Sequence, residues 1–86
     1  MIADLDEAKM HIGIEHTHQD VFLQSLLDRA SDACLRFIGS SEPTPVPLVL
    51  KTAVLQTFAA FFEGREGAGI PDDAALMLHD LRPWVF

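Results

Sequence analysis

The most constraining feature of this sequence is the segment from Pro47 to Phe62, which is more apolar than a helix on the surface of a small monomer. Its polar residues are only Lys51, Thr52, Gln56 and Thr57. At about 100° per residue, the first three fall within one arc of about 140°, and Glu63 joins them. The remaining apolar arc is wider than a surface helix needs. The segment is therefore either the central helix of its own domain or a helix that another chain helps to cover.

Length and composition indicate one small domain over residues 1–86. Hydrophobic residues make up 49% of the chain, which favours a packed fold over disorder. No apolar run is long enough to cross a membrane, and we expect no signal peptide because the first residues lack its basic and apolar regions. The single cysteine excludes an internal disulfide and is typical of a reducing cytoplasm. A formal charge of −7 argues against affinity for the phosphate backbone of DNA.

Capping residues predict where the first helix begins and ends. Asp4 can accept a hydrogen bond from the amide of Glu7 while the Glu7 side chain reaches back, which forms a capping box. Gly13 then supplies the left-handed residue that commonly ends a helix. Thr17 and Asp20 have a similar spacing, so we expect a second capping box at the start of the next helix.

Apolar periodicity predicts a long second helix over about His18–Ile38, ended by Gly39. One continuous face carries Phe22, Leu23, Leu26, Leu27, Ala30, Ala33, Cys34 and Phe37. Polar residues occupy the opposite face, with two exceptions, Val21 and Leu35. A single exposed apolar side chain is common on protein surfaces, but it can also anchor a contact with another chain.

Prolines predict the connection between the two long helices. The segment Ser40–Pro47 holds three prolines and is typical of a semi-rigid extended connector. Thr44 could cap the third helix, because Pro45 and Pro47 would then fall in a first turn that needs no amide donors. Within this helix, we expect the hydroxyl of Thr57 to donate to a backbone carbonyl one turn earlier.

Glycines at positions 64, 67 and 69 separate the third helix from a short last one, predicted from Pro71 to about Leu81. Asp72 and Asp73 suit its positive N-terminal end, and its inward face should carry Ala75, Leu78 and Leu81. No segment alternates like a strand. The predicted fold class is all-α, a small bundle of about four helices, two long and two short, with a Pro-rich connector between the long helices.

Few residues suggest chemistry. His11, His16 and His18 could approach one another, but the sequence places no Cys pair or Glu to complete a zinc site, so solvated histidines explain them better. Cys34 lies on the apolar face of the second helix, where cysteine usually acts as a small buried hydrophobe. The glycines after Phe62 lack the Lys and Ser/Thr of a phosphate loop. We therefore expect no catalytic, cofactor-binding or metal-binding residues, and no enzyme activity.

Short motifs occur in a recognisable order along the chain. The pattern Ala-Lys-x-His-x-x-Ile lies at residues 8–14, and an aromatic-Glu-x-Arg closure lies at residues 62–65. Between them come the polar turn with Asp20, the Pro-containing connector and the apolar helix. This order resembles the small head–tail connector, or adaptor, proteins of long-tailed bacteriophages and prophages. The resemblance covers nearly the whole chain, although Gly13 stands where related chains often carry a basic residue.

The resemblance implies a structural protein rather than an enzyme. It implies a homo-oligomeric ring, roughly dodecameric, on the portal protein at the vertex of the filled capsid. The ring would extend the DNA channel and offer a surface to a neck or tail-completion protein, while DNA passes without specific binding. The expected location is the head–tail junction of the virion, after assembly in the bacterial cytoplasm. A ring of this kind needs two different adhesive surfaces per subunit.

Candidate interface residues follow from the apolar side chains that one subunit would struggle to cover. They are Val21, Leu35, Leu50, Phe61, Trp84 and Phe86. Pro83 prevents the last of these from continuing the fourth helix, so this tail must either fold back onto its own core or insert into a groove on a neighbour. Folding back is the simpler hypothesis because it needs no partner.

Two other functions compete with the connector. The first is a small acidic helical binding protein or regulator that acts as a monomer or dimer, for example by neutralising a basic protein. The second is a histidine-dependent metal protein. Neighbouring genes for portal, capsid and tail proteins would favour the connector over the regulator, and elemental analysis would test for the metal.

Overall fold

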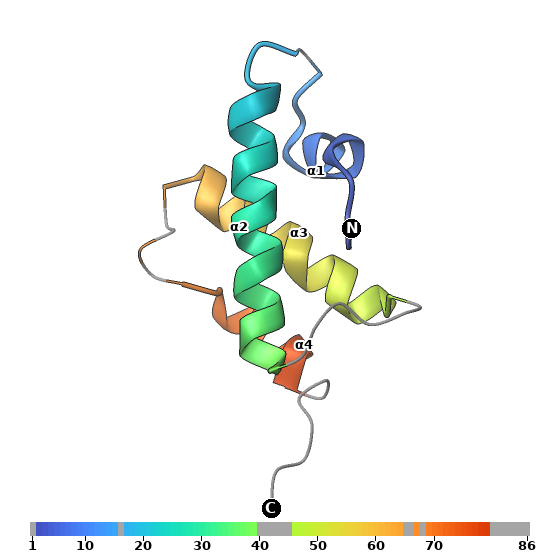
Figure 1. Ribbon diagram of the computed structural model, residues 1–86, viewed down its shortest axis with the longest axis vertical. Helices are drawn as coiled ribbons and strands as arrows, with labels where there is room; N and C mark the ends of the chain where they lie inside the picture. The colour runs from blue at the N-terminus through green and yellow to red at the C-terminus, as the bar shows by residue number, and fades with distance from the viewer. Residues whose placement is uncertain (1, 16, 40–45, 65–66, 68, 80–86) are drawn as a thin grey trace, which may run out of the picture.

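The computed structural model describes residues 2–15, 17–39, 46–64, 67 and 69–79. Within these residues the chain forms four α-helices and no strand (Figure 1). They are α1 (Leu5–Ile12), α2 (Asp20–Ile38), α3 (Leu48–Phe62) and α4 (Asp72–His79). The all-α prediction, with two long and two short helices, is therefore confirmed.

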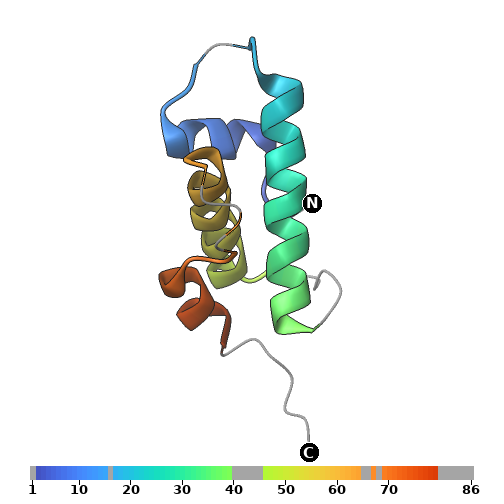
Figure 2. The same ribbon diagram turned by 90° about the vertical axis from the view of Figure 1, so that its left-hand side faces the viewer.

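The long helices α2 and α3 form the centre of the fold, and each short helix covers one end of it. Figure 2 shows α3 beside α2, with α1 crossing near the N-terminal half of α2 and α4 lying level with its C-terminal end. Helix α3 packs against all three of the others. The apolar segment that dominates the sequence is thus the central helix of its own domain.

The core lies where α2, α3 and α4 meet. Its largest fully buried apolar side chains are Phe58, Leu23, Leu27, Leu50, Leu78 and Val54. Ile2 and Ala3, which precede α1, are also buried in this core. The buried positions of α2 repeat three and four residues apart, so one stripe of this helix faces the core, as its periodicity predicts.

Helix α1 begins and ends as predicted. Asp4 accepts a hydrogen bond from the amide of Glu7 at 2.8 Å, and the Glu7 side chain accepts one from the Asp4 amide at 3.3 Å. Gly13 closes the helix with a φ of +78°, and Gly39 closes α2 with a φ of +71°. Both values lie in the left-handed region that favours glycine.

The predicted capping box at the start of α2 is wrong. The helix begins at Asp20, its capping position is Gln19, and no side chain caps it. The Asp20 carboxylate instead accepts a hydrogen bond from Lys9 of α1, so it joins two helices rather than closing one. Phe22, predicted to be buried, is 51% exposed, whereas the next residue, Leu23, is fully buried, so Phe22 lies at the margin of the stripe that faces the core.

Two details of the later helices also differ from the prediction. Helix α3 begins after Pro47, which is its capping residue rather than part of its first turn, while Thr44 and Pro45 lie outside the described residues. In α4 the buried residues are Ala74 and Leu78 rather than Ala75 and Leu78. The inward face thus follows a spacing of four residues, and Leu81 lies outside the described residues.

Candidate interaction surface

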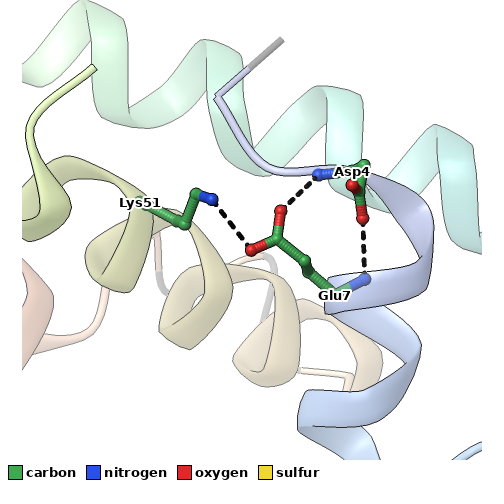
Figure 3. Close-up of polar contacts among 3 residues, drawn as sticks. All are labelled: Asp4, Glu7 and Lys51. Carbon is green, nitrogen blue, oxygen red and sulfur yellow. Dashed lines mark hydrogen bonds and ion pairs between the residues drawn. The ribbon is translucent and has the colours of Figure 1, made fainter. Parts of the chain in front are cut away.

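Two lysines form ion pairs that join α1 to the long helices. Lys51 of α3 donates to the carboxylate of Glu7 at 2.8 Å, and this carboxylate also accepts from the Asp4 amide (Figure 3). Lys9 of α1 donates to Asp20 of α2 at 2.8 Å, and only 8% of Lys9 is exposed. The sequence signalled the capping box but neither ion pair, since their partners lie 44 and 11 residues apart.

The contact between Glu7 and Lys51 shifts both pKa values in the directions that favour the ion pair. The hydrogen bond from Lys51, followed by the one from the Asp4 amide, lowers the pKa of Glu7. The same contact with Glu7 raises the pKa of Lys51. Both groups therefore stay charged near neutral pH, and Lys51, like Lys9, forms an ion pair inside the subunit.

The buried polar groups have structural roles. Cys34 is fully buried, and burial raises the pKa of its thiol, which is the opposite of what a nucleophile needs. Its sulfur lies 3.5 Å from the hydroxyl oxygen of Thr57. That hydroxyl donates to the carbonyl of Ala53 at 2.8 Å, which confirms the predicted bond within α3.

The fold shows which parts of the wide apolar arc of α3 are covered by the subunit itself and which are exposed. Helices α1, α2 and α4 together bury Leu50, Ala53, Val54, Thr57, Phe58, Ala60 and Phe61. What remains exposed on α3 is mainly at its ends, where Leu48 is 77% exposed and Phe62 is 36% exposed. Most of the arc is therefore covered by the subunit itself.

The six candidate interface residues lie in different environments. Val21 is 89% exposed, the highest value among the large apolar side chains of the described residues. Leu35, which the helical projection puts on the polar face of α2, is only partly exposed and packs against the core. The projection takes account of α2 alone and not of the segments that cover it. Leu50 and Phe61 are buried in the subunit's own core, and Trp84 and Phe86 lie outside the described residues.

Val21 lies in a shallow groove along the N-terminal half of α2. The groove has a volume of about 550 Å³ and is lined by Leu5, Asp20, Val21, Gln24, Ser25, Asp28 and Arg29. We call this set of residues the α2 groove. The sequence drew attention to Val21 but not to its neighbours, because Leu5 comes from α1 and only the packing of α1 on α2 brings it there.

The remaining exposed apolar side chains are spread over the other helices. They are Met10, Phe22, Leu48, Val49, Phe62 and Leu76. In the part of the chain that the structure describes, no three His, Cys, Asp or Glu side chains gather as metal ligands, and His16 lies outside that part. None of the described helices is long and apolar enough to span a membrane.

Comparison with known proteins identifies the family. A family model described as Phage gp6-like head-tail connector protein matches residues 2–75. The chain belongs to this family. Head–tail connectors are structural proteins of phage particles and not enzymes, so the α2 groove is a candidate surface for contact with another protein. No curated protein and no solved structure matches the chain.

Proposed function

We propose that this connector assembles as a ring on the portal vertex of the filled capsid. There it extends the DNA channel and presents a surface to the next neck or tail component. The observation that carries this proposal is the family match, which covers all of α1, α2 and α3 and the start of α4. The protein would act at the head–tail junction of the virion, after assembly in the cytoplasm of the host bacterium.

The distribution of exposed apolar side chains supports a ring. A head-to-tail ring needs two different surfaces on each subunit. Val21 is exposed on α2, while Leu48 at the start of α3 and Leu76 of α4 are 77% and 73% exposed. These side chains come from different helices, so one subunit carries apolar side chains for more than one contact.

The charge of the subunit suits a DNA channel. The formal charge of −7 leaves the protein acidic, and Lys9 and Lys51 already pair with carboxylates inside the subunit. A channel lined by acidic subunits repels the phosphate backbone, so DNA slides past without adhering. Portal protein and a neck or tail-completion protein are the expected partners.

Mass measurement in solution tests the proposal. Light scattering over a concentration series, with and without the cognate portal protein, should reveal closed oligomers, and electron microscopy of the portal complex should show a ring. A strict monomer at every concentration that also fails to bind the portal would end this proposal and favour the acidic regulator.

A further inference from the structure

We propose that the α2 groove binds residues 82–86 of a neighbouring copy of this chain, whose sequence is Arg-Pro-Trp-Val-Phe. This inference rests on the proposed ring and names one of its subunit contacts.

The groove lies on the side of α2 that faces away from the core. Val21, Gln24, Ser25 and Asp28 line it, whereas the buried residues of this part of α2 are Leu23, Leu26, Leu27 and Ala30. Successive helix residues are separated by about 100°, so these two sets occupy opposite faces. Val21 therefore has no place in the subunit's own packing, and a partner that covers it removes apolar surface from water.

The chemistry of the groove matches the sequence of residues 82–86. Val21 and Leu5 supply an apolar surface, which suits Trp84, Val85 and Phe86. Asp28 is exposed, and its carboxylate accepts a hydrogen bond at 2.9 Å from the neutral amide of Gln24. A carboxylate accepts more than one hydrogen bond, so Asp28 can also accept one from a cation such as Arg82.

A chain cannot readily place this segment in its own groove. Helix α4 ends at His79, level with the C-terminal end of α2 (Figures 1 and 2). The seven residues after His79 reach about 25 Å when fully extended, and the rise of α2 from Phe37 back to Gln24 is about 20 Å, so a chain would have to be almost fully extended to reach Gln24 in its own groove. The segment would also have to cross to the face of α2 that points away from the core. Docking on a neighbour meets neither obstacle.

Such a contact joins two different surfaces of the same chain. The groove lies along the N-terminal half of α2, and the segment beyond α4 starts near the other end of the molecule. A contact between unlike surfaces is heterologous, and it closes into a ring when the rotation between subunits is suitable. The tail and the groove therefore form one head-to-tail contact of the ring.

Crosslinking between two differently labelled proteins tests this contact. One protein carries Val21→Cys and the other carries Val85→Cys, and a short bismaleimide joins cysteines that lie close together. The native Cys34 stays in place because it is fully buried. The matched control replaces the Val21 variant by Val49→Cys, since Val49 is 42% exposed and lies on α3. We expect about tenfold more mixed dimer from the Val21 pair, because the contact raises the effective concentration of the two thiols.

The outcomes separate this inference from the proposed function. Equal crosslinking of the Val21 and Val49 pairs, in protein that assembles or binds the portal, overturns the groove contact and leaves the connector function standing. An internally crosslinked monomer of the double variant Val21→Cys/Val85→Cys at high dilution shows that the tail binds its own subunit, and it also overturns the inference. If Val85→Cys crosslinks to the portal protein and not to the α2 groove, the inference is also overturned. If the protein associates neither with itself nor with the portal protein, both the groove contact and the proposed function are overturned.

A second variant measures the contribution of the apolar contact. Val21→Asp should weaken self-association about tenfold, since burying a carboxylate beside Asp28 is unfavourable, while Val49→Asp should leave it within about twofold. Both sites are exposed in the subunit, so circular dichroism should show the fold intact in both variants. Equal effects of the two substitutions would contradict the assignment of the α2 groove.

Discussion

The carboxylate of Glu7 stabilises the protein in two ways, since it completes the capping box of α1 and pairs with Lys51 of α3. Its pKa lies below the ordinary value of 4.5 in the folded protein. The folded state therefore binds protons to Glu7 less readily than the unfolded chain. The stabilisation is present above about pH 4.5 and is lost as the pH falls through the folded pKa.

Glu7→Gln tests this linkage. The variant should be less stable than the natural protein near neutral pH, and the difference should shrink as the pH falls below about 4. Thermal unfolding followed by circular dichroism from acidic to neutral pH measures it. Glu15→Gln is the control, because Glu15 is exposed outside α1. A stability difference for Glu7→Gln that does not vary with pH would mean that the ion pair contributes nothing.

At the scale of the helix, α3 distinguishes residues that hold the fold together from residues available for contacts. Phe58 is fully buried and Phe62 is 36% exposed on the same helix. Phe58→Ala should lower the free energy of unfolding by about 3–5 kcal/mol, because it leaves a cavity in the core. Phe62→Ala should cost much less, and chemical denaturation of both variants provides the comparison. Equal losses would mean that the end of α3 is packed as tightly as its centre.

The helices could be predicted from the sequence because their signals are local. The capping box at Asp4, the glycines that end α1 and α2, and the three-and-four spacing of α2 each involve residues within a few positions of one another. These signals gave α1 closely, and α2 to within two residues at its start. The sequence left open whether the subunit itself covers α3, because the answer depends on how α1, α2 and α4 pack against this helix.

The candidate surface could be predicted only in part. Val21 stood out because an apolar residue interrupts the polar face of a helix. Leu35 gave the same signal, yet it packs against the core, so the signal alone does not distinguish contact residues from core residues. Asp20 was predicted to cap α2 and instead binds Lys9. Long side chains can bind partners on other helices, and the spacing of residues within one helix does not predict which partner they bind.

For the whole molecule, net charge governs how subunits approach one another. Each carries a formal charge of −7, so copies repel until salt screens them. Self-association should therefore strengthen as the ionic strength rises from about 0.01 M to about 0.15 M, where the Debye length shortens from about 30 Å to about 8 Å. Sedimentation at fixed protein concentration measures this change. Weaker association at higher salt would show that charge pairs across the interface outweigh the repulsion.

The same charge predicts how the isolated subunit treats DNA. Lys9 and Lys51 are held in ion pairs with Asp20 and Glu7, and Arg36 pairs with Asp32 at 2.9 Å. Too few cations remain together to neutralise a run of phosphates. We expect no measurable binding of labelled duplex DNA at physiological salt by fluorescence anisotropy. Binding that weakens steeply as salt is added would contradict this expectation.

The left-handed residue that ends α2 is a position suited to an amino acid of opposite chirality. Gly39 has a φ of +71°, and a Cβ atom added there meets no heavy atom within 4 Å. The site therefore has space for a Cβ atom, but L-alanine disfavours this backbone conformation. Gly39→Ala should lower the free energy of unfolding by about 1–2 kcal/mol. A D-alanine, introduced by chemical synthesis, prefers this backbone conformation and restricts the unfolded chain. It should raise the free energy of unfolding by about 0.4–1 kcal/mol in chemical denaturation, with the L-alanine variant as its mirror-image control.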